Sequence, residues 1–229
     1  MLKMIVMLTK DDCTVANAVE ILDSIAHTGI KHVGFKDVGI DVSEMKKLMR
    51  IIRAHDMKAY FETVQLTKEK TLSSVDLALE LGADYMMGGK FAESVIPKLS
   101  GEKISYYPYI GNIHDHPCLM GGSLDYIKAE LLRYEDLGVD GTTILAYRYQ
   151  NGIEELLELY KKVARKPCIV AGDVDSIDKI RHLYEIQVEA FTIGTALFNC
   201  NFISGKSVLE QILYLQKELE ILARNHLGR

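Results

Sequence analysis

Apolar positions along the chain follow two alternating patterns. Short runs rich in β-branched and aromatic residues are followed by longer stretches in which apolar residues recur every three or four positions, the period of a helix with one buried face. Residues with a preference for helix N-caps stand near the starts of the longer stretches, at Thr14, at Asp41 or Ser43, at Thr67 and at Ser176. The short runs predict eight strands, at residues 4–9, 32–37, 59–64, 84–89, 104–110, 141–148, 168–173 and 190–195.

This alternation predicts the fold class. Strands that are separated by crossover helices must be parallel. Eight strand–helix units in 229 residues match an α/β fold, a single closed (β/α)8 TIM barrel. The alternative is an open doubly wound sheet, which fits eight even units less well and lacks its GxGxxG turn here. No low-complexity tract or Pro/Ser-rich seam divides the chain, so residues 1–229 are predicted to form one barrel domain.

Composition and charge argue against several kinds of binding partner, among them nucleic acids and membranes. With 48% hydrophobic and 26% charged residues the chain has the composition of a soluble globular protein, and a net charge of −5 argues against a nucleic-acid surface. The apolar runs are too short for a membrane span, and the first residues lack a signal-peptide pattern. Four scattered cysteines without CxxC or metal-type spacing indicate reduced thiols. We therefore expect a cytoplasmic protein with no nucleic-acid or membrane partner, and a homo-oligomer is left open.

In a barrel of this kind the active site lies at the C-terminal ends of the strands. Side-chain alternation along residues 32–37 and 59–64 turns Val33 and Phe35 toward the helices and directs Lys36 and Glu62 into the barrel mouth. A lysine beside a carboxylate can work as an acid/base pair on a carbonyl or hydroxyl group. The alternative is a structural ion pair. A Schiff base on Lys36 is disfavoured, because a neighbouring carboxylate stabilises the charged amine.

Two further strand-to-helix loops carry candidate chemistry. The fifth loop, "GNIHDHPCLMGGS", holds His114, Asp115 and His116, which we expect to form a substrate-binding or acid/base loop, with metal binding or a plain surface loop as alternatives. Arg148 follows the sixth strand and could clamp a carboxylate or phosphate, or could be a solvated surface residue.

The ends of strands seven and eight predict an anion site. Gly172, Gly194 and Thr195 are small enough to present backbone N–H groups, and the hydroxyls of Ser176 and Thr195 could add donors. Asp173 would repel an anion there, so it should point away or take part in proton transfer.

The stretch "IVAGDVDSIDKIRHLYEIQVEAFTIGTALF" (residues 169–198) resembles the C-terminal quarter of the ribulose-phosphate-binding barrel superfamily, which includes histidine- and tryptophan-biosynthesis barrels and pentose-phosphate epimerases. The resemblance implies that Gly172, Gly194 and Thr195 bind phosphate. Asp173 departs from the pattern, because many members have a second glycine there. At the end of strand one, where the histidine-biosynthesis isomerase has an aspartate, the chain offers Lys10, Asp11 and Asp12.

Together these features predict an enzyme that moves a proton next to a carbonyl of a small phosphorylated, sugar-like substrate, as an isomerase, epimerase or aldolase does. Glu62 is the expected base and Lys36 the acid, with His114 and Asp173 as further catalytic candidates and His116 and Arg148 as substrate-binding residues. No cofactor is required, although a divalent metal is left open. The alternatives are a non-catalytic sensor of a phosphorylated metabolite and a metal-dependent lyase that uses His114, His116 and Glu62.

Overall fold

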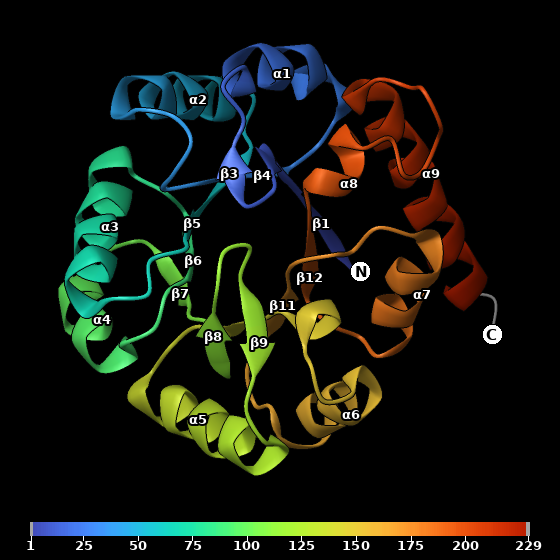
Figure 1. Ribbon diagram of the computed structural model, residues 1–229. Coiled ribbons are helices and arrows are strands. Elements are labelled where there is room, and N and C mark those ends of the chain that lie inside the picture. The colour runs from blue at the N-terminus through green and yellow to red at the C-terminus, as the bar shows by residue number, and fades with distance from the viewer. Residues whose placement is uncertain (1, 228–229) are drawn as a thin grey trace.

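Eight parallel strands form the inner wall of the protein in the computed structural model, which describes residues 2–227 (Figure 1). They are β1 (Lys3–Met7), β4 (His32–Lys36), β5 (Lys58–Thr63), β6 (Tyr85–Gly88), β7 (Ser105–Tyr107), β10 (Thr142–Ile144), β11 (Cys168–Val170) and β12 (Ala190–Ile193). The two outermost strands of this sheet, β7 and β10, meet through a parallel bridge between Tyr109 and Thr143. Thr143 N donates to Pro108 O at 2.8 Å across the same seam. The predicted (β/α)8 barrel is confirmed, with a strand in each of the eight predicted ranges. The strands in the ranges 104–110, 141–148 and 168–173 are shorter than predicted, and Arg148 lies in a 3₁₀ turn after β10.

Helices surround the strands as an outer ring (Figure 1). They are α1 (Ala18–Ile25), α2 (Val42–Ala54), α3 (Lys68–Leu81), α4 (Ala92–Leu99), α5 (Leu124–Leu137), α6 (Ile153–Val163), α7 (Ile177–Glu185) and α9 (Val208–Leu227), with a short α8 (Thr195–Phe198) after β12. Within the described residues, no helix is both long and apolar enough to cross a membrane.

Local signals explain where several of these helices start. The side chains of Asp41, Thr67 and Ser176 each accept a hydrogen bond from the backbone N–H three residues on, as N-caps do. The expectation for Thr14 was wrong: Thr14 belongs to a short strand, and α1 begins only at Ala18. The Thr14 hydroxyl instead donates to Lys36 O at 3.1 Å, so it ties this segment to β4.

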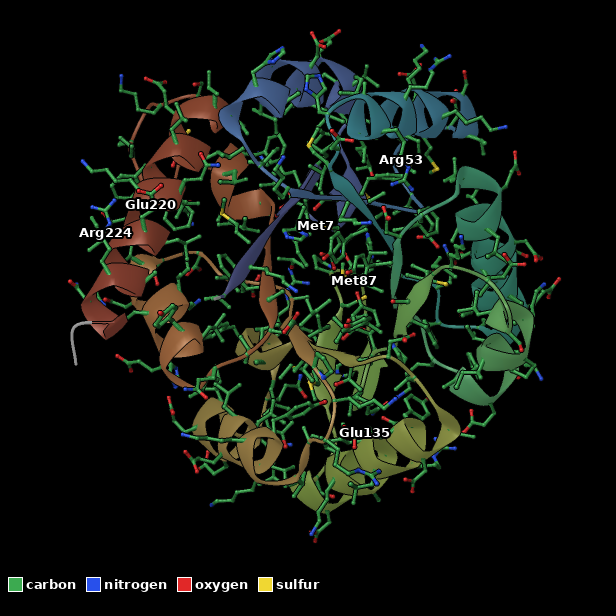
Figure 2. All side chains as sticks on the ribbon, turned by 180° about the vertical axis from the view of Figure 1, so that it is seen from behind. Met7, Arg53, Met87, Glu135, Glu220 and Arg224 are labelled. Atoms are coloured by element: carbon green, nitrogen blue, oxygen red, sulfur yellow. The ribbon has the colours of Figure 1, made fainter. Side chains whose placement is uncertain are left out.

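Alternation along the strands separates two apolar layers. Phe35 and Phe61 belong to the large core between strands and helices, as predicted. Met7, Tyr60 and Met87 belong to a smaller cluster that fills the barrel interior. Figure 2 shows the labelled Met7 and Met87 near the barrel axis, whereas Glu220 and Arg224 lie on the outer ring.

Two hairpins lie at the front of the barrel in the view of Figure 1. The first joins β2 (Thr9–Lys10) to β3 (Cys13–Thr14), and the second joins β8 (Asn112–His114) to β9 (Leu119–Gly121). Both follow barrel strands, β1 and β7, so they stand over the C-terminal ends where the sequence predicts the site. The sequence predicts a loop for the second hairpin. For the first, it places residue 9 at the end of a strand and Thr14 at the start of a helix, with a loop only between them.

Candidate active site

A cavity of about 230 Å³ opens at the C-terminal ends of the strands. Seven predicted site residues line it: Lys36, Glu62, Arg148, Gly172, Asp173, Gly194 and Thr195. The other three, His114, His116 and Ser176, are not among the described residues that line it. Most of the predicted site is therefore brought together around one small chamber.

Lys36 and Glu62 lie next to each other in the lining of this cavity. They are direct partners in the β4–β5 register, so their side chains leave the sheet at the same height. Lys36 Nζ lies 3.3 Å from Glu62 Oε2, and these side chains are only 7% and 3% exposed. The hydroxyl of Tyr109, which follows β7, donates to Glu62 Oε1 at 2.5 Å. One carboxylate oxygen of Glu62 is thus paired with an ammonium group, and the other accepts a hydrogen bond from a phenol.

Electrostatics keep Lys36 charged. Burial alone would lower the pKa of Lys36, but the carboxylates of Glu62 and Asp12 outweigh burial, so that its pKa is raised. An ammonium cannot attack a carbonyl carbon, so the raised pKa works against an imine on Lys36, the less favoured of the roles considered from the sequence. Burial and the charge of Glu62 raise the pKa of Tyr109 far above its usual range, so this hydroxyl stays a hydrogen-bond donor.

Asp12 completes the buried charge cluster and was not among the residues selected from the sequence. It sits in the turn of the β2–β3 hairpin with a left-handed φ of +61°, and it is 6% exposed. Its Oδ1 lies 3.0 Å from Lys36 Nζ, and its Oδ2 lies 3.0 Å from Arg148 Nη1. Burial by itself raises the pKa of Asp12, yet the charges of Lys36 and Arg148 with two further hydrogen bonds bring it down to about 2. The sequence feature that could have identified Asp12 as a site residue was its position just after the first barrel strand.

Arg148 extends this cluster to Asp173. Its Nε lies 3.0 Å from Asp173 Oδ1, and only 9% of its side chain is exposed, so it is not a solvated surface residue. A Cβ at Gly172, where φ is +76°, would lie 2.8 Å from Arg148 Nε. Gly172 is therefore needed so that the guanidinium can lie against the backbone. Glu62, Lys36, Asp12, Arg148 and Asp173 form a line of alternating charges across the mouth.

The second glycine has a packing reason as well. A Cβ at Gly194 would lie 2.7 Å from the backbone oxygen of Thr9, which leaves no room for a side chain. The Thr195 hydroxyl accepts from Asp11 N at 2.9 Å, and the Ser176 hydroxyl caps α7 by accepting from Lys179 N. Gly194 and Thr195 still line the cavity, whereas Ser176 is used by its helix.

The histidine pair of the second hairpin is split. His114 Nδ1 lies 2.8 Å from Asp115 Oδ2, beside its neighbour on the hairpin. His116 Nε2 lies 3.8 Å from Cys13 Sγ on the first hairpin. The three residues predicted for a metal-dependent lyase, His114, His116 and Glu62, do not form a metal-ligand cluster in the described part of the chain. Asp12, His116 and Cys118 do come together.

No protein-family model and no curated protein matches this chain. Solved structures do. One described as native KDPGal is 13% identical over 97% of each chain, with a TM-score of 0.68. The N-acetylmannosamine-6-phosphate 2-epimerase from Clostridium perfringens is 12% identical, covers 95% of this chain and 93% of its own, and has a TM-score of 0.64. A mutant tryptophan synthase alpha-subunit from Pyrococcus furiosus is 14% identical, covers 97% and 99%, and has a TM-score of 0.65.

At these identities the similarity shows the fold. All three share the barrel fold with this chain over nearly its whole length, which agrees with the fold predicted from the sequence. The fold leaves the reaction open, because one barrel architecture carries many chemistries.

Proposed function

We propose that this barrel is an enzyme that transfers a proton next to a carbonyl group of a small phosphorylated, sugar-like substrate. The observation that carries the proposal is the buried Lys36 ammonium, 3.3 Å from the Glu62 carboxylate, at the wall of the cavity. Charged side chains are costly in a barrel interior unless they are paired, and this pair faces a chamber that a ligand can enter. In a proton transfer the carboxylate can accept the proton and the ammonium can stabilise the negative charge that develops.

Each residue has a defined part in the proposed step. The Glu62 carboxylate takes the proton from the carbon next to the carbonyl. The electron pair of the broken C–H bond forms a C=C bond, and the π pair of the carbonyl moves onto its oxygen. The Lys36 ammonium stabilises the oxyanion that forms. Tyr109 holds the Glu62 carboxylate in place. Delivery of a proton to the same carbon from its other face, by a donor other than Glu62, gives an epimer. Return of the proton from Glu62 to the former carbonyl carbon, while the hydroxyl proton of the neighbouring carbon moves to the oxyanion, gives an isomer.

The phosphate group is proposed to bind where the ends of β11 and β12 meet. Gly172, Gly194 and Thr195 line the cavity there, and Arg148 adds a guanidinium, a group whose geometry suits phosphate. The nearby Asp173 carboxylate is paired with Arg148 at 3.0 Å, which reduces its repulsion of an anion. The epimerase among the structural neighbours is named for a sugar 6-phosphate, which supports this substrate class.

Glu62→Gln tests the proposal. Glutamine keeps the shape of the side chain and removes the basic oxygen, so exchange of solvent deuterium into the substrate should fall by roughly 10²–10⁴ while substrate affinity changes little. The assay incubates the protein in D₂O with a panel of phosphorylated aldoses and ketoses and measures deuterium by NMR.

Glu130→Gln is the matched control. Glu130 is a buried glutamate paired with Lys90, but it does not line the cavity, so exchange should persist. Circular dichroism verifies that both variants fold. If no sugar phosphate exchanges a proton but one binds and shifts the thermal transition, the sensor alternative replaces the enzyme. If Glu62→Gln exchanges as fast as the parent protein, Glu62 is not the base.

A further inference from the structure

The two hairpins at the barrel mouth bring together residues that are far apart in the chain. Asp12 and Cys13 come from the turn and second strand of the first hairpin, and His116 and Cys118 come from the turn of the second. His116 Nε2 lies 3.8 Å from Cys13 Sγ. Ligand atoms of Asp12, His116 and Cys118 all lie within 4.8 Å of one another. His116 is thus in reach of both thiols and of a carboxylate.

The residue types define which ion would fit. The three clustered ligand atoms are a thiol sulfur, an imidazole nitrogen and a carboxylate oxygen. Cys13 lies outside this group of three and approaches it through His116, and it would supply a second sulfur to give a tetrahedral S₂NO set. Thiolate ligands select zinc-like ions over magnesium or calcium. Zinc bonds to sulfur and nitrogen measure about 2.3 and 2.0–2.1 Å, which places neighbouring ligand atoms about 3.3–3.8 Å apart. The contact between His116 and Cys13 already has this length. The side chain of His116 is exposed and that of Cys13 is half-buried, so both can move, and Cys13 would have to move toward Asp12 and Cys118 when an ion binds.

Asp12 has one acceptor position left for an ion. An ionised carboxylate offers about four lone-pair directions. Asp12 uses three of them, for Lys36 Nζ, for Arg148 Nη1 and for Cys118 N. The hydrogen bond from Cys118 N also fixes the two hairpins against each other at 2.8 Å.

The neighbouring charges do not exclude a cation. Lys36 and Arg148 carry two positive charges, but Asp12, Glu62 and Asp173 carry three negative ones along the same line. The two thiols would each release a proton to solvent on binding, and the resulting thiolates would balance the charge of a divalent ion.

We propose that Cys13, His116, Cys118 and Asp12 form a binding site for a thiophilic divalent cation, zinc by its ligand chemistry, that pins the two hairpins together over the barrel mouth. The proposal does not depend on the reaction proposed above. It also differs from the lyase alternative, because neither His114 nor Glu62 is a ligand.

The test is metal binding by the purified full chain. After treatment with a chelator and its removal, the protein is titrated with zinc chloride against a competing chromogenic chelator, and cobalt(II) is used as a spectroscopic substitute. We expect one zinc ion per chain and a thiolate-to-cobalt absorption band. Cys13→Ser and His116→Ala should weaken zinc binding by roughly 100-fold or more, since loss of even an outer-sphere partner costs about 10–100-fold.

Matched variants act as controls on the same chain. Cys200→Ser replaces another half-buried free cysteine, and His114→Ala replaces the other histidine of the hairpin. Both should bind zinc as tightly as the parent protein. Cys13 and His116 are not fully buried, so their variants should fold, as circular dichroism can verify. The proposal is overturned if no stoichiometric zinc binds, or if Cys13→Ser and His116→Ala bind as the controls do. Turnover is not measured, so this outcome is independent of the proposed reaction.

Discussion

At the level of single residues, both buried cations of the barrel mouth depend on Asp12. Lys36 and Arg148 each lie 3.0 Å from one of its two oxygens, and Arg148 by itself acts to lower the pKa of Lys36. Without the charge of Asp12, the ammonium and the guanidinium would repel each other at a buried position. The carboxylate therefore decides whether the charge cluster stabilises the fold or opposes it.

Asp12→Asn should lower the free energy of unfolding by about 3–5 kcal/mol, the loss expected when one partner of a buried ion pair is removed. Asparagine tolerates the left-handed backbone at this position, so the change acts on charge rather than on conformation. Urea denaturation at neutral pH measures the loss. Asp11→Asn is the matched control, because Asp11 shares the turn and a positive φ but is exposed. Equal losses in both variants would contradict the electrostatic interpretation.

Residues of the site were predictable where strand alternation determines their direction. The inward direction of Lys36 and Glu62 follows from the two-residue period of a strand, because the apolar residues that alternate with them on each strand must face the helices. Asp12 does not, because a left-handed turn directs its side chain and alternation says nothing about turns. Tyr109 was missed because it reaches Glu62 past the end of β6, from a segment beyond the end of β7. The contact between Cys13 and His116 could not be predicted from a local motif, because 103 positions separate the two residues in the sequence.

At the level of elements, Gly194 joins β12 to α8 where the backbone of β2 leaves no space. A Cβ there would lie 2.6 Å from Thr9 Oγ1 and 2.7 Å from Thr9 O. The second of these atoms is backbone, so it cannot move without shifting the strand.

Gly194→Ala should therefore reduce the free energy of unfolding by about 1–3 kcal/mol, the usual cost of overpacking. Thermal and urea denaturation measure it. Gly121→Ala is the control: its φ is not left-handed, and its Cβ would have neighbours no closer than 3.7 Å, so stability should change little. If Gly194→Ala is as stable as the parent protein, the close approach to Thr9 does not account for the glycine, and ligand binding becomes the better explanation.

Elements were predictable where buried runs alternate with helices. The barrel strands β7, β10 and β11 have only three residues each, but each lies in such a run between helical stretches. The strands of the two mouth hairpins are as short or shorter, and they follow a barrel strand with no helix between. They form because tertiary contacts hold them, such as the bond between Cys118 N and Asp12 Oδ2. The sequence could therefore not predict these hairpins.

For the whole molecule, the two ends of the barrel differ in chemistry. The C-terminal end holds the line of alternating charges, whereas rings fill the opposite end. There Tyr60 stacks on Tyr85 with ring centroids 4.2 Å apart, and the Tyr60 hydroxyl lies 3.1 Å from His32 Nδ1. The number of strand–helix units predicted the closed barrel. The sequence did not predict this aromatic end, because His32 and Tyr60 meet only through the register of β4 with β5.

His32 should make the stability of the whole barrel depend on pH. Burial and the charges of Lys3 and Lys58 outweigh the opposing charge of Glu189, so the pKa of His32 stays below its ordinary value of 6.5. Between the two pKa values the unfolded chain binds the proton more readily than the folded one, so stability falls as the pH falls through this window. The contribution is fully present above pH 6.5 and is progressively lost below it. Urea denaturation from about pH 7 to about pH 5 should show this decline, and His32→Asn should make it shallower. His27→Asn, at an exposed histidine, should leave the slope as it is, and a slope that His32→Asn does not alter would show that another group carries the pH dependence.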